Sequence, residues 1–246
     1  MNSSPPQIPI QPAPLEYGMK NLATALGGSA AVKIVALGSS TTAGEGGIVA
    51  YPYRLEAALR GEYQNRHPNQ TRMIDVLNRG IGGEEAPKEL LRINRDVIDE
   101  KPSLVIWQIG TNSVWQSAGD NPPSREKTIA DLCEGIERLR GVGGIDIILM
   151  DPQFVPAMLT PATFEATNAM VSTIAQVARD KKVNLFRRFE LMKAWHELAR
   201  ISFDRMVDPT DPNRLHDSDW ATQQLTYALC QVIFDAVDKA QASQPS

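Results

Sequence analysis

The sequence predicts a single α/β domain with three layers: about five parallel β-strands with helices on both faces. Three observations support this prediction. Short β-branched runs alternate with longer stretches of helical period along the chain. Most of the short runs are apolar on successive residues, as expected of strands that are covered on both faces. No Asn-Gly pair or similar hairpin turn separates them. A chain of 246 residues is long enough for one such domain.

Five segments have the short apolar pattern of a central strand. They are residues 31–38, 73–80, 103–110, 145–152 and 183–189. Because each is followed by a helical pattern, we expect the strands to run parallel.

Five longer segments have apolar residues at helical spacing. They are residues 53–64, 86–100, 124–140, 160–182 and 220–240. The first follows Pro52 and the second has a proline in its first turn, a position that proline favours. Ser124 is a suitable N-cap for the third.

The two ends of the chain differ from the domain between them. Residues 1–24 are predicted to be a Pro-rich extended arm, since five of the first fourteen residues are proline. Residues 25–242 form the predicted domain, and residues 243–246 a short tail. No Lys or Arg precedes an apolar stretch in the arm, which is not typical of a secretory signal and favours a cytoplasmic location. A secreted or periplasmic location stays open, because such an arm also remains where an export signal has been removed.

Composition excludes several classes of function. A net charge of −4 without a basic stripe argues against binding to nucleic acid or to an anionic membrane. No apolar run approaches the roughly 20 residues that span a bilayer. No cluster of Cys and His has metal-ligand spacing, so neither a metal nor another cofactor is predicted. Cys133 and Cys230 lie in predicted helices, and the sequence leaves open whether they pair.

Three predicted strands end in glycine next to a hydroxyl or amide side chain. These ends read GSSTTAG, NRGIGG and GTNS. A fourth polar stretch, DPNRLHDSDW, places His216 just before the last helix. Ligands of parallel sheets bind at the carboxyl ends of strands. The first end is not a phosphate-binding P-loop, because it lacks the closing lysine, and no G-x-G-x-x-G pattern follows the first strand.

Together these stretches resemble the four signature blocks of the SGNH (GDSL-like) hydrolase family. The blocks correspond to residues 38–44, 78–83, 110–113 and 213–216. Any one block is a weak signal, but all four occur in the family's order, and the likeness extends from about residue 31 to residue 240. The resemblance implies a flavodoxin-like α/β/α fold and a serine esterase that forms an acyl-enzyme.

The resemblance also implies a role for each block. Ser40 aligns with the nucleophile and His216 with the base, and histidine is well suited to accept a proton near neutral pH. The oxyanion hole would combine the backbone N–H groups of Ser40 and Gly80 with the side-chain amide of Asn112. At Gly80 a Cβ would crowd the oxygen, and Asn112 can donate without carrying a charge. Taken alone, each of these residues also fits a plain structural role, as a helix cap or a turn residue.

The other two histidines belong to no motif. His67 lies in a polar loop, where we expect it to be solvated, and His196 lies on a helical segment as a packed or surface residue.

Two positions depart from the family pattern. Ser39 replaces the aspartate beside the nucleophile, and Asn213 replaces the acid that lies three residues before the histidine. Three arrangements are open for the third member of the site. Asn213 orients the ring, or Asp211 serves as the acid if the turn at Pro212 allows it, or a backbone carbonyl supports a Ser-His dyad. The alignment favours Asn213, with Asp211 second.

The predicted function is hydrolysis of a carboxylic ester, with short-chain or acetyl esters favoured and a small molecule or glycan as the substrate. Trp107 is expected to be buried in the third strand. Trp115 either lines the pocket, where it would suit a sugar ring or a flat acyl group, or packs against the sheet. Two alternatives keep the same fold: an impaired module that binds an acyl or glycan ligand, and an acyltransferase that uses the same site. The sequence does not predict an oligomeric state.

Overall fold

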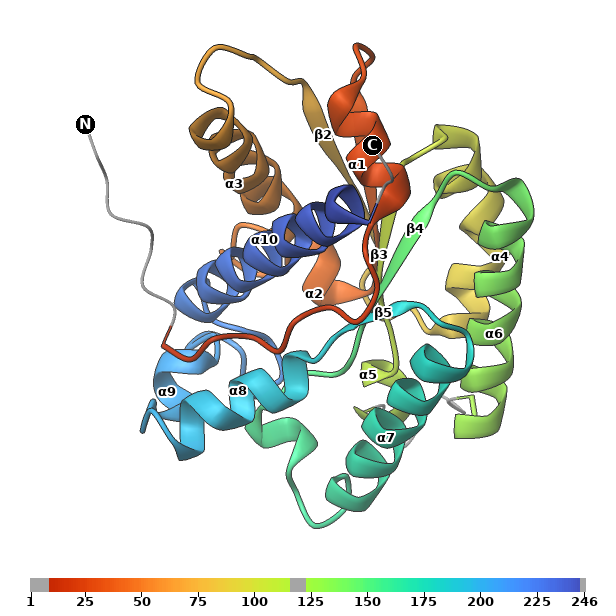
Figure 1. The fold of residues 1–246 in the computed structure, drawn as a ribbon. Coiled ribbons are helices and arrows are strands. Elements are labelled where there is room, and N and C mark those ends of the chain that lie inside the picture. The colour runs from red at the N-terminus through yellow and green to blue at the C-terminus, as the bar shows by residue number, and fades with distance from the viewer. Residues whose placement is uncertain (1–8, 116–122, 244–246) are drawn as a thin grey trace.

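The computed structural model describes residues 9–115 and 123–243, and its centre is a five-stranded parallel sheet (Figure 1). The strand order is β2-β1-β3-β4-β5, and every pairing is parallel. The strands are β1 (Val32–Gly38), β2 (Ile74–Gly80), β3 (Leu104–Gln108), β4 (Asp146–Met150) and β5 (Asn184–Phe186). The predicted fold class is therefore confirmed, and each strand lies within its predicted segment.

Helices cover both faces of the sheet (Figure 1). On one face lie α1 (Lys20–Gly27), α3 (Tyr51–Arg66), α8 (Arg188–Glu197) and α10 (Asp219–Ala242). On the other lie α4 (Ala86–Asp96), α6 (Arg125–Val142) and α7 (Phe164–Asp180). Shorter elements connect them: α2 (Ser40–Ala43), η1 (Ile98–Glu100), α5 (Thr111–Trp115), η2 (Pro156–Met158) and α9 (Phe203–Met206). The three-layer arrangement thus follows the predicted alternation.

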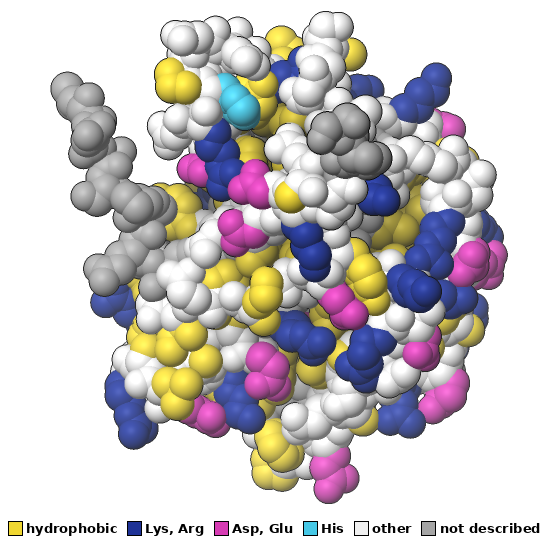
Figure 2. All heavy atoms as spheres, in the orientation of Figure 1, with side chains coloured by type: hydrophobic (Ala, Val, Ile, Leu, Met, Phe, Trp, Pro, Cys, Tyr) yellow, Lys and Arg dark blue, Asp and Glu magenta, His cyan; other side chains and the backbone are white. Residues whose placement is uncertain are grey.

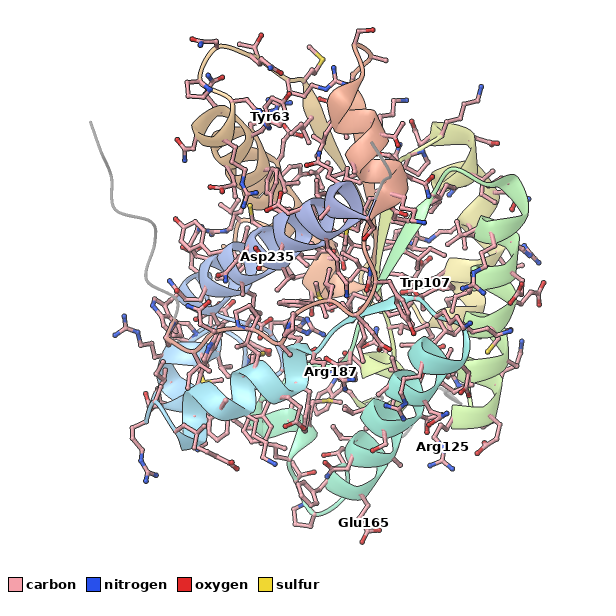
Figure 3. The ribbon with its side chains drawn as sticks, viewed as in Figure 1. Tyr63, Trp107, Arg125, Glu165, Arg187 and Asp235 are labelled. Carbon is pink, nitrogen blue, oxygen red and sulfur yellow. The ribbon has the colours of Figure 1, made fainter. Side chains whose placement is uncertain are left out.

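Successive residues of each strand feed two separate cores. Ile34 and Ala36 belong to the core beneath α3 and α10, whereas Val35 and Leu37 belong to the core beneath α4 and α6. Neighbouring residues of a strand point to opposite faces, so burial on both sides requires the continuous apolar runs seen in the sequence. Trp107, a residue of β3, is fully buried, as predicted, in the core beneath the helices of the second face (Figure 3).

The N-terminal segment differs from the expected extended arm. Helix α1 begins at Lys20, within the segment predicted to be extended, and Leu15 and Met19 are buried in the core. The Met19 N–H donates to the Ala236 carbonyl of α10 at 3.0 Å. The proline content of the segment predicted an extended arm, although its apolar residues are buried against the domain. Residues 1–8 of the predicted arm and 244–246 of the predicted tail lie outside the described residues.

The last predicted strand is too long. β5 ends at Phe186, and α8 begins at Arg188, although the sequence pattern continues to residue 189. The reason is that Arg187 and Arg188 interrupt the apolar run after Phe186. The fully buried Arg188 side chain donates to the Asp151 carbonyl from the first residue of α8.

Cysteines and surface charge complete the outline. Cys133 and Cys230 are both free thiols, which answers the question of pairing. Figure 2 shows acidic and basic side chains interspersed over one face of the molecule, with no basic patch there. Within the described residues, every helix is too short or too polar to span a lipid bilayer.

Candidate active site

Ser40 stands at the start of α2, directly after β1. The turn is so closely packed that only glycine fits at position 38. A Cβ on Gly38 would overlap the Thr42 hydroxyl and come within 2.9 Å of the Gln108 Oε1 atom. Ser39 fills the position of the family's aspartate, and its N–H and hydroxyl both donate to Gln108 Oε1, at 3.2 and 3.3 Å. A neutral amide at the end of β3 therefore holds the turn that presents Ser40.

Ser40, His216 and Asp211 form a hydrogen-bonded series. The Ser40 hydroxyl lies 3.0 Å from His216 Nε2, and His216 Nδ1 lies 2.8 Å from Asp211 Oδ2. In the tautomer with the proton on Nδ1, the ring donates to Asp211 and accepts from Ser40. The structure thus brings together the predicted nucleophile, the predicted base and the second of the two predicted acids.

The prediction that favoured Asn213 for the acid position is not what the geometry shows. Asn213 is exposed, and its contact in the site is through its backbone N–H, which donates to Asp211 Oδ1 at 2.9 Å. The reason is the turn that starts at Pro212. Arg214 has φ +56° and its N–H donates to the Asp211 carbonyl, so the chain folds back and places residue 211 beside the ring.

The local backbone stabilises the charge of Asp211. Burial alone would raise the pKa of its carboxyl group, but N–H donors from His216, Asn213 and Leu215 outweigh that effect, together with the imidazole. The result is a pKa below the ordinary value for aspartate. The group is therefore ionised at neutral pH, next to the imidazole that would receive a proton.

The predicted oxyanion donors lie at neighbouring strand ends, but two of them are engaged. The Gly80 N–H donates to Asn78 Oδ1 at 2.9 Å, and Asn112 Nδ2 donates one hydrogen to the Glu84 carbonyl at 2.8 Å. Since an amide nitrogen carries two hydrogens, Asn112 retains a second donor. Gly80 pairs with Gly38 across the first two strands, which brings it close to the turn at Ser40.

Gly80 has a stronger reason to be glycine than the one predicted. A Cβ there would overlap the backbone of Thr42 and Ala43 in α2. Asn78 of β2 also stabilises the contact between β2 and α2, because its Nδ2 donates to the carbonyl of Ala43, the last residue of α2, at 3.1 Å. The glycine therefore allows α2 to lie directly against β2.

Beneath the site lies a buried polar network that sequence reasoning missed. Gln108 Nε2 donates to Thr111 Oγ1 at 3.3 Å, and Thr111 Oγ1 donates to Gln153 Oε1 at 3.0 Å. Gln153 Nε2 then donates to the carbonyl of Leu215, the residue before His216, at 3.0 Å. The network thus connects the turn at Ser40 to the loop that carries the imidazole. Its only sequence signal is a glutamine at the end of one apolar strand and a second just after the next.

Arg188 supports this network from the centre of the protein. Its Nη2 donates to Gln153 Oε1 at 2.8 Å and its Nε to the Asp151 carbonyl at 2.9 Å. The carboxylates of Asp151 and Asp217 are also buried near it, with Asp217 Oδ2 3.9 Å from Nη1. Burial raises the pKa of Asp217 to about 6 and that of Asp151 to about 7, although Arg188 opposes both shifts.

A cavity opens beside Ser40 and His216. Glu45, Ile48 and Ala50 are among the residues that line it. Trp115 is not one of them, and its partly buried ring packs against the larger core, in line with the packing alternative. Among the described residues, no group of three His, Cys, Asp or Glu side chains is placed to hold a metal ion.

The other two histidines lie away from this series. His67 is exposed at the C-cap of α3. His196 Nδ1 lies 2.9 Å from the Ile201 carbonyl, and its ring stacks on Phe203. Neither is paired with a serine in the described part of the chain.

Comparison with known proteins gives one family and several similar structures. Residues 6–239 match the profile of the non-GDSL lipase-like family. No curated protein sequence matches the chain. A lipase/acylhydrolase from Enterococcus faecalis superposes with a TM-score of 0.64 at 20% identity, covering 87% of this chain and 100% of the other. A catalytic mutant of an acetylxylan esterase from Geobacillus stearothermophilus superposes with a TM-score of 0.66 at 20% identity, covering 82% and 94%. These likenesses show an SGNH-like fold.

Proposed function

The chain belongs to the non-GDSL lipase-like family, and from that premise we propose that it is a serine esterase that hydrolyses a carboxylic ester. The observation that carries the proposal is the continuous series from Asp211 through His216 to the Ser40 hydroxyl. A serine beside a histidine that is oriented by a carboxylate is the arrangement that activates a hydroxyl for acyl transfer.

Each group of the series has one task in the proposed reaction. Ser40 Oγ attacks the ester carbonyl while its proton passes to His216 Nε2. The ionised Asp211 holds the ring and stabilises the imidazolium that forms. The imidazolium then protonates the leaving alcohol. Water next attacks the acyl group while His216 Nε2 takes its proton, and that proton passes to Ser40 Oγ as the acid leaves.

The developing oxyanion needs donors at the strand ends. The Ser40 N–H lies in the first turn of α2, where helical N–H groups lack partners within the helix. The second hydrogen of Asn112 Nδ2 is a further donor. We propose that the Gly80 N–H joins them when Asn78 releases it, since that N–H has a single hydrogen and is already engaged.

Short-chain or acetyl esters are the proposed substrates, and a carbohydrate is the proposed alcohol. The similar structure named as an acetylxylan esterase supports this choice, and so does the small cavity that opens directly on Ser40. The alternative of an impaired binding module rested on the missing acid at position 213. With Asp211 beside the ring, that reason no longer applies.

The proposal is tested with p-nitrophenyl acetate, by comparing kcat/KM of the wild type with that of Ser40→Ala without added metal. We expect activity in the wild type and its loss in the variant. Equal activity in both would show that another group is the nucleophile, and no activity in either would favour a binding module.

A further inference from the structure

Glu45 is a charged residue at the site to which the proposed reaction assigns no role. It follows Ser40 by five positions, on the loop between α2 and α3. The glycines on either side of it, Gly44 and Gly46, have φ of +80° and +65°, backbone conformations that residues other than glycine rarely adopt. This backbone turns the Glu45 side chain back toward the site, with 45% of it exposed.

The carboxylate of Glu45 lies between the imidazole and the turn after β2. Its Oε2 is 3.6 Å from His216 Nε2, the atom that also faces the Ser40 hydroxyl. Its Oε1 occupies the place where a Cβ on Gly82 would stand. Among the described residues, no lysine or arginine forms an ion pair with Glu45, and the contact with His216 becomes an ion pair only when the ring is protonated.

This position corresponds to one part of the ester. In acyl transfer by a serine and a histidine, Nε2 gives its proton to the leaving oxygen, so the leaving alcohol must lie beside that atom. A carboxylate 3.6 Å from Nε2 is therefore next to the alcohol part of the substrate. The carbonyl oxygen of the ester faces the oxyanion donors instead.

We propose that Glu45 is a specificity-determining residue that selects esters whose alcohol part carries neighbouring hydroxyl groups, as a polyol or a sugar does. This inference rests on the proposed function. An ionised carboxylate only accepts hydrogen bonds, and bonds from hydroxyl groups to it are stronger than those between neutral groups. A cationic alcohol gains less at a half-exposed position, because solvent screens the ion pair. An apolar alcohol leaves the carboxylate without a donor.

Two acetates with the same three-carbon skeleton test the inference: glycerol monoacetate, which has two free hydroxyl groups, and propyl acetate, which has none. The measured quantity is the ratio of their kcat/KM values, from acetate release, in the wild type, Glu45→Ala and Glu45→Gln. We expect this ratio to fall about tenfold in Glu45→Ala, the loss typical of a hydrogen bond to a charged group, and less in Glu45→Gln. Glu165→Gln is the matched control, because it removes the same charge from an exposed position on α7 (Figure 3).

The possible outcomes separate this inference from the proposed function. Hydrolysis of propyl acetate that depends on Ser40, with the same ratio in all variants, would keep the esterase and reject the role of Glu45. A rise of the ratio in Glu45→Ala would reject it as well, since Glu45 would then obstruct the polyol. Acetylcholine is measured as a third, cationic acetate, and a Glu45-dependent preference for it over glycerol monoacetate would overturn the assignment to hydroxyl groups. No Ser40-dependent release from any acetate would reject the esterase, and the inference with it.

Discussion

Asp211 Oδ2 lies 2.8 Å from His216 Nδ1, although five positions separate the two residues in the sequence. The same oxygen accepts the backbone N–H groups of Leu215 and His216, both at 2.8 Å. A single carboxylate therefore fixes the loop and the ring together, which makes it both a structural group and the candidate third member of the site.

Asp211→Asn should lower kcat for p-nitrophenyl acetate by about four orders of magnitude, the loss typical of this change in a serine triad. Asn213→Ala should change kcat little, because the exposed Asn213 side chain does not contact the ring. Thermal unfolding of both variants checks that the loop still folds. Comparable losses of kcat in the two folded variants would contradict the assignment of Asp211.

The difference between Asp211 and Asn213 shows where sequence reasoning reached its limit. Continuous apolar runs determine the parallel strands, because each strand must be covered on both faces, and the strand ends that carry Ser40 and Asn112 follow from them. The residue that meets the ring depends instead on the backbone of a turn, including the φ of +56° at Arg214, which residue types alone do not determine.

The buried network was unpredictable for another reason. Its members come from segments far apart in the chain, and Gln153 receives a hydrogen bond from Arg188 across 35 positions. The position of a glutamine in an apolar strand does not predict which side chain it will form a hydrogen bond with. Such pairs follow only from how the elements pack, whereas apolar periodicity is local and can be read directly.

Asn112→Ala should lower kcat by about 10²–10³, with a smaller effect on KM, if its free amide hydrogen binds the oxyanion. Asn112→Asp keeps the size of the side chain but removes the donor, so it should show a similar loss. Steady-state kinetics with p-nitrophenyl acetate measures both. Near wild-type kcat in Asn112→Asp would show that this amide does not bind the oxyanion. A loss of stability in the same variant would instead assign the amide to its hydrogen bond with the Glu84 carbonyl.

Gly80→Ala should destabilise the protein by about 1–3 kcal/mol, because the new Cβ meets the backbone of α2 and the helix has to shift. The shift would also displace Ser40, so kcat should fall in the folded fraction. Gly61→Ala is the matched control: Gly61 lies within α3, and a Cβ there meets no atom within 4 Å. That variant should be stabilised by about 0.5–1 kcal/mol. Urea unfolding of the two variants should therefore give changes of opposite sign, and changes of the same sign would contradict this account of the junction.

Glu89 should make the protein less stable as pH rises. Its side chain is buried in α4 and accepts the Trp107 indole N–H at 2.7 Å. Burial raises the pKa of its carboxyl group to about 7, although that hydrogen bond and the charge of Arg92 favour the ionised form. Since the folded-state pKa is the higher one, the folded protein binds more protons than the unfolded chain between about pH 4.5 and 7. The contribution of Glu89 to the free energy of unfolding is therefore complete below about pH 4.5 and is lost as pH rises through about 7.

Each pKa unit corresponds to about 1.4 kcal/mol, so the loss is on the order of 3 kcal/mol. Glu89→Gln keeps an oxygen for the indole and removes the ionisation. Urea unfolding at pH 5 and pH 8 should therefore show a smaller fall in the free energy of unfolding for Glu89→Gln than for the wild type. The exposed Glu165→Gln should fall as the wild type does. An equal fall in Glu89→Gln would assign the pH dependence to the other buried carboxyl groups, Asp151 and Asp217, whose pKa values burial also raises.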